Sequence, residues 1–204
     1  DLPGIVDPDH VTFIRGKAAE FLKSHRDAGA GEVPLVPERL RRSMELAVGA
    51  TIPEEDIELW VEQMALDPAA RSFSWRREPD AARKAGFMVA VVGAGMGGLN
   101  AAVQLKRAGI PFVVIEKNPG VGGTWHENRY PGARVDTPSR AYAHIFAVGY
   151  PCLSPFAPQP VNEGYFNWIA DNFVLRDHLV FDTEVERIAW DEDAKRWTVY
   201  ASGP

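Results

Sequence analysis

Three glycines and one carboxylate in the middle of the chain have the spacing of a dinucleotide-binding site. Gly93, Gly95 and Gly98 form the pattern G-x-G-x-x-G, and Glu116 follows 21 positions after the middle glycine. In such a motif the first glycine allows a tight turn, the second lets backbone approach a pyrophosphate, and the third lets a helix pack closely on a strand. An acid about 20 residues later accepts hydrogen bonds from ribose hydroxyls. The expected chemistry is therefore the binding of a diphosphate and its sugar.

The elements that must position these residues can be predicted from the flanking sequence. The apolar run Phe87 to Val92 predicts a strand buried on both faces, and Met96 to Ala108 predicts a helix. Gly109 should end that helix, and Pro111 to Ile115 should form a second strand that leads into Glu116. A glycine-rich turn in an ordinary βαβ unit is the structural alternative. An acid at position 116 argues against a 2′-phosphate, so FAD or NAD(H) remain.

The composition places limits on the class of protein. The chain has 204 residues, of which 46% are hydrophobic and 25% charged, which is typical of one or two globular domains. Its net charge of −6 gives no general attraction for nucleic acid. Cys152 is the single cysteine, so a disulfide framework is excluded and a reducing cytoplasm is the simplest setting. We expect no membrane span and see no signal peptide, although a chain that opens on Asp1 could already lack its natural start.

The first third of the chain has the pattern of three helices. Asp7-Pro8 provides an N-cap with proline at the first helical position, and residues 37–48 repeat the plan with Gly49 as the stop. Residues 51–54 have the form of a capping box in which Thr51 caps the third helix. The apolar stripes of these helices favour packing against other helices, the next domain or a second copy of the chain.

These patterns predict an α/β fold: a Rossmann-like domain preceded by a small all-helical domain. We place the helical extension at residues 1–70, a linker at 71–85 and the nucleotide-binding domain at 86–204. In the linker, Phe73 and Trp75 should attach a solvated connection to the domain surface. Further on, residues 150–160 are proline-rich and predict an ordered loop. We then expect a helix over 162–173, a strand over 179–181, and a hairpin of 183–190 with 196–201.

From Gly122 to Asp136 the sequence is similar to a known enzyme family. The run Gly-Gly-Thr-Trp-x-x-Asn-Arg-Tyr-Pro-Gly-x-x-x-Asp, behind the first glycine motif, resembles the FAD-binding segment of the Baeyer–Villiger monooxygenases, the class B flavoprotein monooxygenases. The resemblance extends from about Val89 to Tyr200. Ordinary FAD-dependent reductases share the glycines and the acid but not this run. The helical extension is similar to that of the 4-hydroxyacetophenone monooxygenases, including Arg-Asp-Ala-Gly at residues 26–29.

The resemblance implies a nucleotide half and a flavin half of one cofactor site. On the nucleotide side the three motif glycines would cradle the FAD pyrophosphate, Glu116 with the adjoining Lys117 would hold the ribose, and Val185 would meet the adenine through its backbone. On the flavin side the resemblance implies Gly123, Thr124, Trp125, Asp136 and Tyr142. Asp136 would lie near the reactive edge of the isoalloxazine. In this family that aspartate positions an arginine from a later domain, which makes Asp136 the implied catalytic residue.

Structural roles compete with some of these assignments. Trp125 could be a core aromatic residue, and Arg129 could form a structural ion pair with Asp136. His126 and His144 match no catalytic role and are expected to be surface or locally bonded histidines. Cys152 has no activating neighbour in the sequence, so we assign it no role.

A Baeyer–Villiger enzyme also needs parts that this sequence lacks. It has no second G-x-G-x-x-G for NADPH, no Phe-x-Gly-x-x-x-His-x-x-x-Trp fingerprint, and no counterpart of the later arginine. We therefore expect the N-terminal, FAD-binding piece of a longer enzyme, not catalytically competent alone. The resemblance implies that the parent uses NADPH, FAD and O2 to convert a ketone into an ester or lactone, and that no metal takes part.

Two other classes of function stay open at this stage. One is another FAD-dependent monooxygenase or reductase. The other is a non-catalytic nucleotide-binding or dimerisation module in which the N-terminal helices join two copies. Identifying the oxygenation products of the full-length protein would distinguish the first class from a Baeyer–Villiger enzyme. Measuring the size of the chain with and without residues 1–70 would test the second class. The sequence does not identify the ketone.

Overall fold

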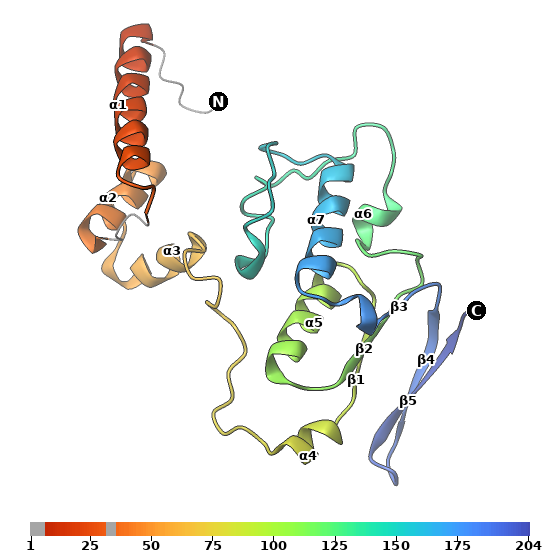
Figure 1. Cartoon of the computed structure of the whole chain (residues 1–204). Coiled ribbons are helices and arrows are strands. Elements are labelled where there is room, and N and C mark those ends of the chain that lie inside the picture. Colours follow the sequence, from red (N-terminus) through yellow and green to blue (C-terminus); the bar gives the residue numbers. More distant parts are fainter. Residues whose placement is uncertain (1–6, 32–35) are drawn as a thin grey trace. The chain divides into compact units, whose positions relative to one another are not determined.

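The computed structural model describes residues 7–31 and 36–204 (Figure 1). Residues 1–6 and 32–35, which fall in the predicted helical extension, lie outside the described residues. The chain divides into two compact units, Asp1–Ile57 and Glu58–Pro204.

The N-terminal unit contains the first two predicted helices, and the third predicted helix begins at its last residue, Ile57. Helix α1 (Pro8–Asp27) begins where expected, because the side chain of Asp7 accepts from the backbone N–H of Asp9 at 2.9 Å. Helix α2 (Pro37–Val48) ends at Gly49 in the left-handed conformation. A 3₁₀ turn (Glu54–Asp56) then leads into α3 (Ile57–Gln63). The predicted capping box is wrong. The N-cap residue of the 3₁₀ turn is Pro53, which provides no side-chain cap, so Thr51 lies two positions too early to cap the turn.

Helix α1 buries none of its residues within the described structure. Phe13, Ile14, Phe21 and Leu22 are 47–64% exposed, so the packing expected of this stripe is not made inside the unit. Met44 of α2 and Ile52 are buried instead. Arg41 stabilises that small core by donating to the Ile52 carbonyl at 2.9 Å and to the Glu54 carboxylate at 2.6 Å.

The second unit is built on a parallel sheet with helices packed against it (Figure 1). Strands β1 (Val89–Val92), β2 (Phe112–Ile115) and β3 (Leu179–Val180) pair in the order β1-β2-β3. Helix α5 (Met96–Ala108) connects β1 to β2 and contacts both, and α7 (Gln159–Asn172) packs on α5. Leu99, Val114, Phe166 and Ile169 are fully buried in the core between these layers.

Strand β1 differs from its prediction. It begins at Val89, and its residues alternate between half-buried and exposed, with Val92 54% exposed. Phe87 and Met88 are also exposed. The prediction that β1 is buried on both faces was wrong. Strand β1 lies at the edge of this sheet, and among the described residues its neighbours β2 and α5 leave alternate side chains open to solvent.

The remaining elements surround the sheet. The linker holds a short helix α4 (Ala81–Ala85), and Trp75 donates its indole N–H to the Ala108 carbonyl at 3.2 Å, as expected of an anchor. Helix α6 (Thr124–Glu127) is a single turn that the sequence analysis missed. Helix α7 begins three residues earlier than predicted, because Pro160 occupies its first turn, where a missing N–H costs nothing. Strands β4 (Glu184–Asp191) and β5 (Arg196–Ser202) form the predicted hairpin.

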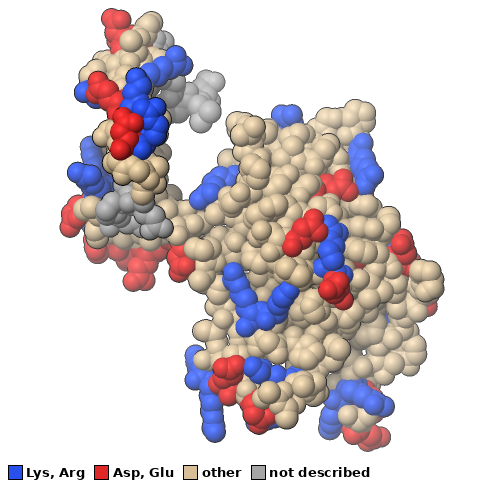
Figure 2. Space-filling model, in the orientation of Figure 1, with Lys and Arg blue, Asp and Glu red and all other residues tan. Residues whose placement is uncertain are grey.

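Charged side chains are mixed on the surface seen in Figure 2, where small groups of Lys and Arg alternate with Asp and Glu. That face therefore offers no extended region of one sign. Among the described residues, none of the helices combines the length and the apolar character that a membrane span requires.

Candidate functional site: a glycine-lined cleft at the end of the parallel sheet

A cleft of about 300 Å³ lies at the carboxyl ends of β1 and β2, the edge at which α/β sheets bind ligands. It brings together predicted residues from segments far apart in the sequence. Those that line it are Gly93, Gly95, Glu116, Lys117, Gly123, Thr124 and Val185. Val92, Ile115, Asn118, Glu127, Thr183 and Glu184 complete the lining.

The first glycine segment leaves the start of α5 open. Gly93 turns the chain with a φ of +92° while its N–H donates to the Ile115 carbonyl at 2.7 Å. Gly95 is the N-cap residue of α5, and no side chain caps this helix. The first N–H groups of a helix point at an anion and carry the positive end of its dipole. This geometry suits a diphosphate.

Gly98 has a different task, because it lies inside the helix and outside the cleft lining. A Cβ added there would overlap the carbonyl oxygen of Gly93 and lie 2.9 Å from its carbonyl carbon. The glycine therefore lets α5 pass directly against the turn that precedes it. This is the packing role predicted for the third glycine of the motif.

A second glycine pair, Gly122 and Gly123, lies directly against the first glycine segment. A Cβ on Gly123 would lie 3.0 Å from the Cα of Gly95, and Gly123 has a φ of +52°. The N–H of Gly122 donates to the carbonyl of Ala94 at 3.0 Å, which joins the two loops. Two backbones without side chains thus form one wall of the cleft.

Glu116 is 4% exposed and is held by the backbone around it. Its carboxylate accepts from the N–H of Ala94 at 2.6 Å and from the N–H of Asn118 at 2.9 Å. A carboxylate has about four acceptor positions, so these two bonds leave capacity for ribose hydroxyls. The acid therefore lies beside the glycine turn and in the cleft.

Lys117 and Glu127, two further charged residues of the cleft, are paired with each other. Lys117 Nζ lies 3.0 Å from a carboxylate oxygen of Glu127, and the Asn118 amide donates to the same oxygen at 3.1 Å. The bond from Asn118, followed by that from Lys117, lowers the pKa of Glu127. The bond to Glu127 raises the pKa of Lys117. Both groups remain charged near neutral pH, so Lys117 does not present a free cation to the cleft.

Trp125 points away from the cleft. Trp125 is 8% exposed and belongs to the hydrophobic core, as the structural alternative for this residue predicted. The indole N–H donates to the hydroxyl of Tyr142 at 2.9 Å. The backbone before Trp125 lines the cleft through Gly123 and Thr124, so the buried indole fixes that segment from behind.

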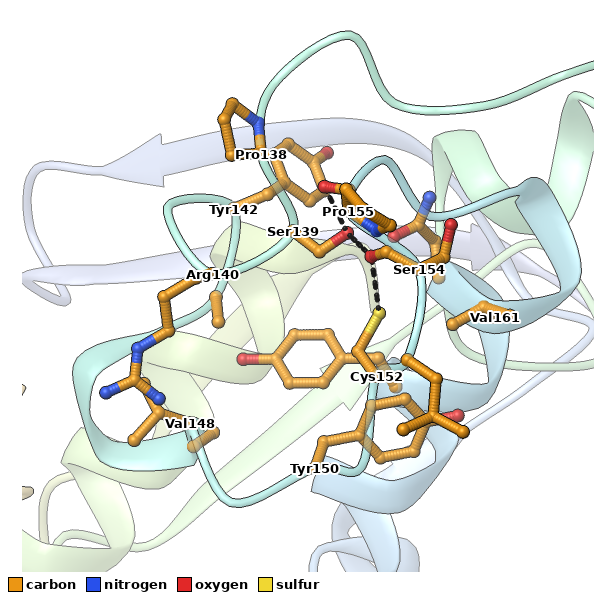
Figure 3. Close-up of a pocket in the computed structure, with 15 residues that line it drawn as sticks. Pro138, Ser139, Arg140, Tyr142, Val148, Tyr150, Cys152, Ser154, Pro155 and Val161 are labelled. Atoms are coloured by element: carbon orange, nitrogen blue, oxygen red, sulfur yellow. Dashed lines mark hydrogen bonds between the residues drawn. The ribbon is translucent and has the colours of Figure 1, made fainter. Parts of the chain in front are cut away.

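Tyr142 also lines a second cavity of about 450 Å³, shown in Figure 3. Tyr142 and Tyr150 lie on two sides of it in that view, with Cys152 between them. Ser139 donates to the Ser154 carbonyl at 2.8 Å, and the Cys152 thiol donates to the same carbonyl at 3.4 Å. These polar groups are satisfied by the protein itself, so the cavity offers mainly aromatic and apolar surface.

Asp136 is exposed and does not line either cavity. Its carboxylate accepts from the Thr137 hydroxyl at 3.4 Å. The alternative ion pair with Arg129 is wrong, because Arg129 lies 2.9 Å from the carboxylate of Glu163 on α7. Among the described residues, the Asp136 side chain thus makes no ion pair.

The two histidines differ from each other. His126 is locally bonded, as expected, with Nδ1 2.9 Å from Glu163. His144 is not a surface residue: it stacks on Phe146 with ring centroids 4.9 Å apart, and its buried Nε2 has no partner among the described residues. Burial lowers the pKa of His144. The sequence analysis missed Glu163 and Gln159, for which the one available signal is their i, i+4 spacing.

Comparison with known proteins agrees with this geometry. Residues 91–157 match the family model for an NAD(P)-binding Rossmann-like domain. A Baeyer–Villiger monooxygenase of Streptomyces coelicolor is 48% identical over 112 residues, which are 54% of this chain and 22% of the relative. An uncharacterized monooxygenase of Sinorhizobium fredii, y4iD, is 31% identical over 188 residues, 91% of this chain and 27% of the relative.

A solved structure, OTEMO in complex with FAD and NADP, has a TM-score of 0.52 and 37% identity over 55% of this chain and 22% of that one. The fold and the cleft thus define a Rossmann-like nucleotide-binding domain. The comparisons confirm, more particularly, the resemblance of this domain to the Baeyer–Villiger monooxygenases. The chain spans about a quarter of the length of the curated relatives just described.

Proposed function

We propose that this chain binds FAD and is the FAD-binding portion of an NADPH- and O2-dependent monooxygenase that converts ketones to esters or lactones. One observation carries the proposal: the uncapped start of α5, the facing glycine Gly123 and the buried Glu116 share one cleft. A dinucleotide needs such a backbone cradle for its diphosphate and a carboxylate for its sugar. The relatives named above support the flavin monooxygenase class.

Each residue would have a defined task toward FAD, which supplies the redox and oxygen chemistry when bound. Gly93 and Gly95 admit the diphosphate to the helix start, Gly98 keeps α5 against the turn, and Glu116 beside Lys117 accepts from the ribose. On the flavin side, Gly123 and Thr124 present backbone, while the bond between Trp125 and Tyr142 holds them. We assign the backbone of Val185 to the adenine. Asp136 is assigned to position an arginine outside this chain; NADPH would bind outside it too.

A flavin titration and a product assay test the proposal. We expect the purified chain to quench FAD fluorescence saturably. We expect the longer protein to consume NADPH and O2 and to form an ester from a ketone, with Asp136→Ala lowering the ester formed per NADPH. Failure of the chain to bind FAD would contradict the cofactor assignment. Reduction or N-hydroxylation without ester formation would instead favour another flavoprotein class.

We propose in addition that the helical extension joins two copies of the chain. The exposed stripe of α1, formed by Phe13, Ile14, Phe21 and Leu22, supports this, because burying four large apolar side chains stabilises an interface. The double substitution Phe13→Ser, Phe21→Ser should therefore convert a dimer into a monomer in sedimentation equilibrium. Leu153→Ser, which removes a 98% exposed side chain from the other unit, is the control. A monomeric wild-type chain would exclude the proposal.

The proposed small-molecule partners are a ketone and O2. A cytoplasmic location remains our proposal and is supported by the single free Cys152. Cell fractionation with detection of the chain would test it, and recovery from an oxidising compartment would argue against it.

A further inference from the structure

Four polar side chains connect α6 to the start of α7, and we call them the Glu163 cluster: His126, Arg129, Gln159 and Glu163. One carboxylate oxygen of Glu163 lies 2.9 Å from His126 Nδ1 and 2.9 Å from an Arg129 guanidinium nitrogen. The other oxygen accepts from the Gln159 amide at 2.9 Å. The same Gln159 nitrogen donates to the carbonyl of Trp125. The cluster therefore attaches both the side chains and the backbone of the α6 region to α7.

The contact with Glu163 favours one tautomer of His126. An ionised carboxylate can only accept, so the bond of 2.9 Å to Glu163 needs the tautomer of His126 that carries its proton on Nδ1. Arg129 lies 3.2 Å from the same Nδ1 and also donates to Glu163, so one carboxylate oxygen is shared by both side chains. The side chains of His126 and Glu163 are 17% and 23% exposed, and charge-assisted bonds that are partly shielded from water are the stronger kind.

Helix α6 depends on such tertiary bonds. It has four residues, and its N-cap residue Gly123 provides no side-chain cap. A single isolated turn is unfavourable, because nucleation fixes several residues for one hydrogen bond. Its first residue, Thr124, and the preceding Gly123 line the cleft. The shape of that wall is thus set by groups behind it.

We propose that Glu163 is a positioning residue for the cofactor cleft. By holding His126, Arg129 and Gln159, it keeps the segment from Gly122 to Trp125 in the conformation that receives the dinucleotide. This inference rests on the proposed FAD function for its effect on affinity. Its effect on the order of the segment does not depend on FAD.

Two readouts on the full chain test the role of Glu163. Glu163→Ala should weaken FAD binding about tenfold, because three side chains lose a partly buried charged partner. Hydrogen–deuterium exchange without FAD should become faster in the peptide over residues 119–129 and stay unchanged over residues 98–109. His126→Ala should show the same trend. His126→Asn, whose amide nitrogen can replace Nδ1 as donor, should recover most of the FAD affinity.

Asp171→Ala is the matched control. Asp171 is also on α7 and forms an ion pair with Arg176 at 2.7 Å, but neither residue lines the cleft. This variant should leave the FAD dissociation constant within about twofold of the wild-type value, whatever its effect on the thermal midpoint. An equal loss of affinity in Asp171→Ala and Glu163→Ala would overturn the proposal.

The two proposals fail separately. If the wild-type chain does not bind FAD, the proposed function is contradicted, while the exchange experiment still decides the positioning role. If FAD binds and Glu163→Ala changes neither its affinity nor the exchange of residues 119–129, the positioning role is wrong and the function stands.

Discussion

Replacing Gly98 by alanine is expected to cost about 3 kcal/mol or more of folding free energy and to abolish FAD binding. The new Cβ would overlap the carbonyl oxygen of Gly93, which is backbone and cannot rotate aside. Helix α5 would have to move away from the turn, and that movement would take its open N-terminus away from the diphosphate position. Urea unfolding and FAD titration measure the two effects.

The adjacent Gly97 provides the control for this prediction. It is exposed in the same helix, and a Cβ added there meets no heavy atom within 4 Å. Gly97→Ala should therefore stabilise the chain by about 0.5–1 kcal/mol through helix propensity and leave FAD binding intact. If Gly98→Ala unfolds at the same urea concentration as the wild type, the close contact between Gly93 and Gly98 is not present in solution.

Replacing Glu116 by glutamine is expected to lower stability by about 2 kcal/mol and FAD affinity by at least about tenfold. Both carboxylate oxygens accept from backbone, one from Ala94 and one from Asn118. A glutamine side chain keeps the size but presents an N–H₂ group to one of these donors, which leaves that donor unsatisfied. The ribose would lose the charged carboxylate and be left with one neutral carbonyl oxygen as acceptor.

Glu186→Gln makes the same chemical change at an exposed position of β4 and should change stability by less than about 0.5 kcal/mol. Comparing the two variants by urea unfolding separates the buried acceptor from a change in net charge. An unaltered FAD dissociation constant in Glu116→Gln would show that the ribose does not use this acid.

The sequence predicted the part of the fold that local rules determine. Helix α5 has the predicted ends, because a glycine N-cap, an apolar stripe and Gly109 in the left-handed conformation are all local signals. The predicted lining of the cleft was assembled from the glycine motif and from the acid at the end of β2. Both follow from the carboxyl ends of parallel strands meeting at one edge.

The parts that were missed depend on contacts between distant segments. Burial of β1 on both faces required neighbours that the described chain does not provide. Helix α6 has no side-chain cap, and its His126 bonds to Glu163, which lies 37 positions later in the chain. Arg129 was paired with Asp136 in the sequence alternative because the two are close in the chain. The structure pairs it with α7 instead.

The hydrogen bond from Gly122 to the carbonyl of Ala94 has a consequence for energetics. Because it joins the two glycine loops, neither can open without releasing the other, and they form a single cooperative unit. A ligand that contacts both loops orders them in one step. The loss of loop conformational entropy on binding is therefore shared by the two loops and does not arise separately for each. A substitution distant from the ligand that loosens either loop therefore lowers the affinity for the ligand, because more loop entropy is lost on binding.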